Sequence, residues 1–199
     1  MSRALILASA SLARRRMLES AGVALEVQPA DVDEPAIKAS RLAEGAPVPE
    51  IAETLAEAKA CAVSGARPAA LVLGADQVLE IDGALWDKPA DLDEARAQLI
   101  QLRGRSHALM SAAVIAEAGQ PVWRHTSVAK LTMRPFTDAF LDGYLEQTGV
   151  SVLSSVGAYH LEGLGAQLFA RIEGDFFTVL GLPLIEVLGY LRARGVLPE

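Results

Sequence analysis

The sequence predicts an α/β fold with one central sheet. Short apolar runs of strand length alternate with longer runs whose apolar residues recur at helical spacing. No repeat or low-complexity linker interrupts this alternation. The chain has 199 residues, of which 51% are hydrophobic and 22% charged, a composition typical of a folded protein. We expect a single domain over residues 1–199, because this length can bury one sizeable core.

The chain is expected to begin with a strand, a loop and a helix. Residues 3–7 form a short apolar run, and residues 12–22 show helical spacing up to Gly22, which is suited to a helix C-terminus. Residues 24–35 alternate apolar and polar side chains, which predicts a second strand that its prolines end. A helix is expected over 49–64, where apolar residues again recur at helical spacing.

A buried strand, a hairpin and a helix are expected next. The apolar run over 69–76 has strand length and ends on Asp76. Residues 77–89 read as a hairpin with Asp82-Gly83 as its turn. A helix over 91–102 would be capped by an aspartate at its start and followed by a glycine at its end.

The last third of the chain predicts two long strands and two helices. Residues 107–135 form the strands and turn near Gly119. Residues 136–149 form a helix, and residues 180–195 form a closing helix with a proline in its first turn. The glycine-rich segment 163–174 is read as a turn into a strand.

A basic segment near the start of the chain is unexpected in a protein with a formal net charge of −7. Ser9 and Ser11 follow the first strand, and Arg14 lies at the start of the first helix. Helix N-termini and arginines both bind phosphate well. The alternative is a solvated basic helix face. The acidic net charge argues against nucleic-acid binding, so an anionic ligand requires a local cluster of this kind.

Acidic and basic side chains recur at two further places. Glu34 lies in the acidic segment 31–34, which is either an ordinary surface loop or a source of metal ligands. Asp76 is expected at the end of a buried strand, where α/β folds place ligands, and Lys88 follows one hairpin later. With Lys59, these residues offer cations for a polyphosphate and carboxylates for a metal or an attacking water, as phosphoanhydride hydrolysis requires.

Five segments in order resemble the Maf family of nucleoside triphosphate pyrophosphatases. They are "LASASLARRRMLESAGV", "DVDE", "LAEAKA", "GADQVLEIDGALWDKPADLDEARAQLIQLRGRSH" and "GAYHLEGLGAQLFARIEGDFFTVLGLPL". The resemblance implies an elongated α/β fold with a mixed sheet and a cleft between two lobes, related to the inosine triphosphate pyrophosphatases. It also implies hydrolysis of a nucleoside triphosphate between its α and β phosphates with Mg²⁺ or Mn²⁺, by a protein that forms homodimers.

The resemblance also assigns roles to individual residues. Asp76 would accept the proton of the attacking water, and Glu34 and Asp76 would hold the metal. The phosphates would be bound by Ser9, Ser11, Arg14, Lys59 and Lys88. The chain departs from the family's Ser-x-Ser-Pro-Arg-Arg motif, because Leu12 and Ala13 replace the proline and the first arginine.

Base selection in the family depends on the positions of Ala13, Gln77 and Glu162. With Gln77 and Glu162 at two of these positions, the chain resembles the subgroup that acts on 7-methyl-GTP. A glutamate can accept hydrogen bonds from guanine N1–H and N2–H. Ala13 cannot stack on a base as an aromatic would. The alternatives are a pyrophosphatase specific for dTTP and UTP, and a regulator of cell division that binds a nucleotide without hydrolysing it.

Several other classes of protein are disfavoured. No phosphate-binding loop of the kinase type and no histidine–cysteine zinc pattern is present in the sequence. No apolar run approaches the ~20 residues of a membrane-spanning helix. The single cysteine, Cys61, fits a reducing compartment and is expected to be buried, so we expect a cytoplasmic protein that binds no membrane.

Overall fold

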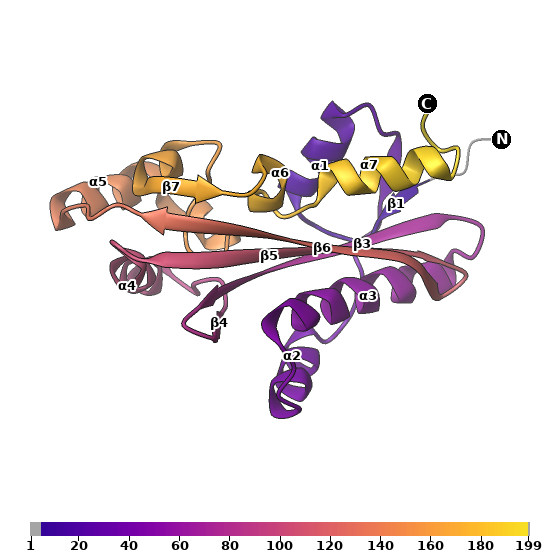
Figure 1. Ribbon diagram of the computed structural model, residues 1–199, viewed down its shortest axis with the longest axis horizontal. Coiled ribbons are helices and arrows are strands. Elements are labelled where there is room, and N and C mark those ends of the chain that lie inside the picture. Colours follow the sequence, from indigo (N-terminus) through magenta and orange to yellow (C-terminus); the bar gives the residue numbers. More distant parts are fainter. Residues whose placement is uncertain (1–4, 199) are drawn as a thin grey trace. The chain divides into compact units, whose positions relative to one another are not determined.

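The strands form one mixed sheet in a computed structural model that describes residues 5–198 (Figure 1). The strand order is β2-β1-β3-β5-β6-β7, and β4 pairs with β3. Strand β1 is parallel to β2 and β3, whereas β4 and β7 run antiparallel to their partners. The strands are β1 (Leu5–Leu7), β2 (Leu25–Val27), β3 (Leu71–Ile81), β4 (Ala84–Trp86), β5 (Ser106–Glu117), β6 (Gln120–Met133) and β7 (Phe169–Glu173).

Helices connect most of these strands, which confirms the predicted α/β fold with a mixed central sheet. The helices are α1 (Leu12–Ser20), α2 (Glu34–Ala43), α3 (Val48–Ala66), α4 (Leu92–Leu102), α5 (Asp138–Thr148), α6 (Phe176–Val179) and α7 (Leu184–Ala193), with 3-10 turns η1 (Gly149–Ser154) and η2 (Leu164–Leu168). Among the described residues, no helix is long and apolar enough to cross a membrane.

The chain divides into two compact units. The first holds the described residues up to Gln77 together with 110–127 and 176–198, and the second holds 78–109 and 128–175. Strands β3, β5 and β6 contribute residues to both units. The single domain over 1–199, the elongated outline and the cleft between lobes stay predictions.

The core of the first unit lies on both faces of the central strands. Leu5, Leu7, Leu71 and Leu73 belong to one apolar cluster, which also includes residues of α1 and α7. The alternate residues Ile6 and Val72 belong to a second cluster with Val63 of α3. Because side chains alternate along a strand, residues 72, 74 and 76 of β3 share the face that meets α3.

Helix α3 approaches β3 closely at Gly74. A Cβ atom at this position would lie 2.1 Å from the carbonyl oxygen of Ala56 and 2.6 Å from the nitrogen of Ala60. Only glycine therefore fits between the strand and the helix backbone without a shift of one of them. This contact places Lys59, which precedes Ala60, beside the residues that follow Gly74.

Most predicted helices and strands are confirmed. The aspartate cap expected for the helix over 91–102 is Asp91, whose side chain accepts a hydrogen bond from the nitrogen of Glu94, and Thr137 caps α5 in the same way. The hairpin turn at Asp82-Gly83 and the turn near Gly119 are present, with positive φ at the residues concerned. The expected first strand included residues 3 and 4, which lie outside the described residues.

Four expectations were wrong in detail. Asp76 does not end a strand, because β3 continues through the first arm of the hairpin to Ile81. The segment 24–35 forms only the three residues of β2 before α2 begins at Glu34, so the acidic loop is partly helical. Pro183 is the N-cap of α7 and not part of its first turn. Cys61 is only partly buried, because it lies at the edge of the buried face of α3.

Candidate functional site

Two carboxylates share one ammonium group in the first unit. The Nζ atom of Lys59 lies 2.7 Å from Oδ1 of Asp76 and 3.0 Å from Oε2 of Glu34. The side chains of Lys59 and Asp76 are each 10% exposed, whereas that of Glu34 is 42% exposed. We call these three residues the ion cluster. Its carboxylates thus range from nearly enclosed to half open to solvent.

Three different elements supply the ion cluster, and local features position each of them. Lys59 belongs to α3, and the Gly74 contact brings that helix against β3, which carries Asp76 two residues later. Glu34 is the first residue of α2. Asp33 caps that helix, since its side chain accepts a hydrogen bond from the nitrogen of Ala36 at 3.0 Å. A carboxylate in the first turn of a helix is also stabilised by the helix dipole.

Arg14 is buried beside the ion cluster. Its Nε donates to the carbonyl of Gly181 at 2.8 Å, and its Nη1 donates to the carbonyl of Ala75 at 2.9 Å. Burial lowers the pKa of this guanidinium, while the charges of Asp76 and Glu34 act in the opposite direction. Among the described residues, no hydrogen bond engages Nη2, so that end of the guanidinium can still bind an anion.

The two serines that precede Arg14 have different tasks. The Ser9 hydroxyl accepts from the nitrogen of Ser11 and from Nη1 of Arg14, both at 3.2 Å, which leaves its one hydrogen to donate to a ligand. Ser11 is the N-cap of α1, and its hydroxyl accepts from the nitrogen of Arg14 at 3.3 Å. The structure therefore gives Ser11 a structural role, and its contact with phosphate stays a prediction.

Gln77 holds the turn that contains α6. Its Nε2 lies 3.0 Å from the hydroxyl of Ser111 and from the carbonyls of Thr178 and Val179. The Ser111 hydroxyl also donates to the Thr178 carbonyl, at 2.7 Å. Gly181, whose carbonyl binds Arg14, follows in the same turn with a φ of +101°. This set was missed from the sequence, although a polar residue beside Asp76 in a buried strand was a signal for it.

The structure also describes the remaining predicted residues. Ala13 lies partly buried on α1. Lys88 follows β4 and Glu162 lies in the turn before η2, and both are exposed residues of the second unit. Their roles in binding phosphate and base stay predictions.

The ion cluster has the donor chemistry of a magnesium or manganese site. Mg²⁺ is usually bound through one or two carboxylates, with substrate phosphates and water completing its shell. Glu34 and Asp76 offer two such carboxylates beside the same ammonium. Within residues 5–198 no group of three or more histidine, cysteine, aspartate or glutamate side chains is placed to hold a metal. The residues thus fit a metal that arrives with a phosphate ligand.

A family model and several relatives match the chain along nearly its whole length. A family model described as "Maf-like protein" matches residues 4–194. The nucleoside triphosphate pyrophosphatase of Paramagnetospirillum magneticum is 56% identical over 192 residues, which cover 96% of this chain and 99% of the relative. That of Caulobacter vibrioides is 54% identical over 191 residues, with 96% of each chain covered.

One solved structure is similar along nearly the whole chain. It is a nucleoside-triphosphatase, or dITP/XTP pyrophosphatase, from Mycobacterium abscessus. The match covers 98% of this chain and 97% of that chain, with 17% sequence identity and a TM-score of 0.41.

Proposed function

This chain belongs to the Maf family and is a nucleoside triphosphate pyrophosphatase, a hydrolase, and we propose that the ion cluster is its reaction centre. There the triphosphate is cleaved between its α and β phosphates, which yields the monophosphate and pyrophosphate. The observation that carries this proposal is the contact of one buried ammonium with two carboxylates.

Asp76 is proposed to act as the general base. Lys59 engages its Oδ1, which fixes the carboxylate and leaves Oδ2 to accept a hydrogen bond from water. The water oxygen attacks the α phosphorus while its proton passes to Asp76. The bond from the α phosphorus to the bridging oxygen then breaks, and pyrophosphate leaves with the bonding electron pair.

The triphosphate is proposed to bind to the cations and hydroxyl around the cluster. Arg14 offers Nη2, Ser9 offers its hydroxyl hydrogen, and Lys59 offers the charge of its ammonium. Ser11 and the N-terminus of α1 would add backbone N–H groups. Lys88 is also proposed to bind the phosphates.

A divalent cation, Mg²⁺ or Mn²⁺, would be held by Glu34 and Asp76. Such an ion neutralises polyphosphate charge and stabilises the charge that develops during cleavage. Glu34 is the more exposed of the two carboxylates, so it can turn toward a metal–nucleotide complex as that complex arrives.

For the base, we propose a purine, with 7-methylguanine as the first candidate. Glu162 is exposed and can accept two hydrogen bonds from a guanine edge, and its charge complements a methylated, cationic base. Gln77 and Ala13 are the other positions proposed to affect base choice. A preference for dTTP and UTP is the alternative. We also propose a cytoplasmic homodimer.

The experiment is pyrophosphate release across dTTP, UTP, CTP, GTP and 7-methyl-GTP with Mg²⁺ or Mn²⁺. The D76N variant should lose at least about a hundredfold in turnover, since a general base commonly supplies 10²- to 10⁴-fold. The matched control is E117Q, which removes a carboxylate of the same unit that Arg194 binds at 2.7 Å.

Near-normal turnover by D76N would refute the role of Asp76 as the base. Binding of every triphosphate without cleavage of any would favour the nucleotide-binding regulator instead. The proposed base preference is tested separately by E162Q. This variant should change the ranking of the five triphosphates by rate of pyrophosphate release, and an unchanged ranking would contradict the proposal.

A further inference from the structure

Helix α2 is attached to the protein mainly by charged side chains. It contains no buried residue. Its partly buried positions are Glu34, Ile37, Lys38 and Arg41, which follow the helical spacing of a single face. Only one of these four side chains is apolar. The hydrophobic effect therefore contributes little to where this helix lies, although it carries a residue of the ion cluster.

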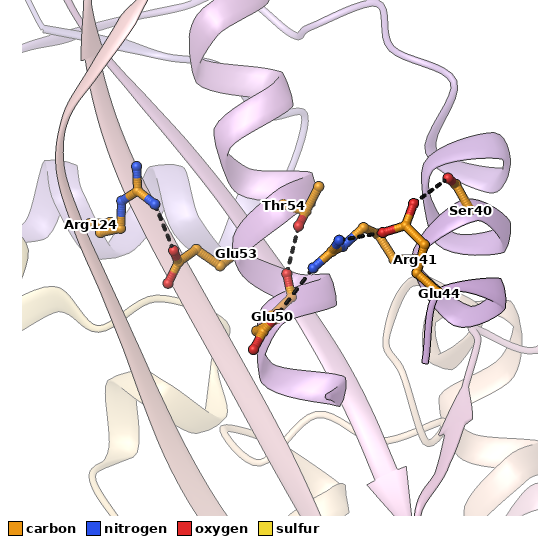
Figure 2. A network of polar contacts seen from close by, with 7 residues as sticks. All are labelled: Ser40, Arg41, Glu44, Glu50, Glu53, Thr54 and Arg124. Atoms are coloured by element: carbon orange, nitrogen blue, oxygen red, sulfur yellow. Dashed lines mark hydrogen bonds and ion pairs between the residues drawn. The ribbon is translucent and has the colours of Figure 1, made fainter. Parts of the chain in front are cut away.

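Arg41 provides the polar attachment near the end of α2 opposite Glu34. Its Nη2 lies 3.0 Å from Oε2 of Glu50 on α3, and its Nη1 lies 2.5 Å from Oε2 of Glu44. Figure 2 shows the Arg41 side chain reaching from α2 to α3 between these two carboxylates. The Ser40 hydroxyl holds the other oxygen of Glu44 at 3.0 Å. Arg41 thus joins α2 to α3 through Glu50, while Glu44 and Ser40 at the end of α2 hold its guanidinium in place.

The two ends of α2 therefore contact the same helix. Glu34 meets Lys59 of α3 at one end, and Arg41 meets Glu50 of α3 at the other. Arg41 lies seven positions after Glu34, which is about 10 Å along a helix axis. If the Arg41 contact is lost, α2 can pivot about its remaining contacts, and the carboxylate of Glu34 moves with it.

We propose that Arg41 is a positioning residue that holds the Glu34 carboxylate at the ion cluster through its contact with Glu50. This inference depends on the proposed metal-binding role of Glu34. Arg41 does not touch the reacting atoms. It acts by limiting the orientations of α2, so that Glu34 is in place when the divalent cation binds.

The test measures binding of Mn²⁺ together with a non-hydrolysable α,β-methylene nucleoside triphosphate, by electron paramagnetic resonance, and amide hydrogen exchange of residues 34–43. R41M should weaken Mn²⁺ binding about two- to fivefold, the range that a partly exposed ion pair can supply. It should also speed exchange in α2. R41K keeps the charge and should recover part of the binding. E50Q should resemble R41M, and the double variant should be no worse than either single one.

The matched control is R124M. Arg124 of β6 is also a partly exposed arginine that forms ion pairs with carboxylates of α3. Its Nη1 lies 3.1 Å from Oε1 of Glu53, as Figure 2 shows, and its Nη2 lies 3.1 Å from Oε2 of Glu57. Its contacts join α3 to β6 and do not involve α2. Since α3 also buries Ile51 and Leu55 in the core, loss of Arg124 should change neither Mn²⁺ binding nor exchange in α2.

The outcomes separate this inference from the proposed function. Faster exchange in R41M with unchanged Mn²⁺ binding would overturn the inference, because Arg41 would hold the helix without positioning Glu34. Equal effects of R41M and R124M would overturn it as well. The variant E34Q tests the premise. If it binds Mn²⁺ like the wild type, the metal-binding role of Glu34 is refuted and the inference fails with it, whereas pyrophosphate release and D76N still test the activity.

Discussion

Replacing Lys59 with methionine keeps the apolar stem of the side chain but removes the ammonium that Asp76 and Glu34 share. The carboxylate of Asp76 would then be buried without its ion partner, since both side chains of the pair are only 10% exposed. Removing one partner of a buried pair typically costs about 3–5 kcal/mol. We expect about 3 kcal/mol, the lower end of that range, because Arg14 still acts on Asp76.

For a chain of this length, that loss in the free energy of unfolding lowers the melting temperature by about 6–12 °C. The assay is urea and thermal denaturation followed by circular dichroism, with K130M as the control for loss of an exposed lysine on β6. The double variant K59M/D76N removes both charges and should be more stable than K59M alone. A K59M variant as stable as the wild type, or a double variant no more stable than K59M, would refute this reasoning.

Two further predictions concern His107 and Gly74. His107 is buried, with Nε2 2.7 Å from the Tyr159 hydroxyl, and burial lowers its pKa to about 4. The unfolded chain, with an ordinary histidine pKa of about 6.5, binds more protons between these values, so stability should fall by about 3 kcal/mol as the pH drops from about 6.5 to about 4. H107F should lose this part of the pH dependence in urea denaturation, and parallel curves would contradict the assignment. G74A should lower the free energy of unfolding by at least about 1–3 kcal/mol and should strongly reduce turnover, because its Cβ would meet the backbone of α3. The control G65A meets nothing within 4 Å, so comparable losses in both variants would show that the close approach is not the cause.

The predictable part of the fold is the part that rests on local periodicity. Strand β1 and most of β5 are buried as continuous apolar runs, α3 buries residues at helical spacing, and much of β6 alternates between more and less exposed residues, so their patterns are visible in the sequence. Helix α2 buries none, which left only its Asp33 cap and Pro35 in the first turn as signals. Asp76 was read as a strand end because a charge in a buried strand is unusual, but Lys59 neutralises it there.

The residues of the candidate site could be selected from the sequence, but their contacts could not. Glu34, Lys59 and Asp76 come from three segments, and their meeting at one nitrogen atom depends on tertiary packing. Arg14 was expected at a phosphate, whereas two of its hydrogen bonds go to the carbonyls of Ala75 and Gly181. Backbone carbonyls leave no mark in a sequence, because every residue has one.

The close approach at Gly74 has a consequence for how the enzyme responds to its substrate. Since the backbones of α3 and β3 set their own separation, the two elements that carry Lys59 and Asp76 are held at a fixed spacing. At the proposed reaction centre, the charges that would surround the phosphate are then brought together during folding, before any nucleotide arrives. Such an environment needs little reorganisation energy when charge shifts in the transition state, which is the main advantage a folded site has over bulk water.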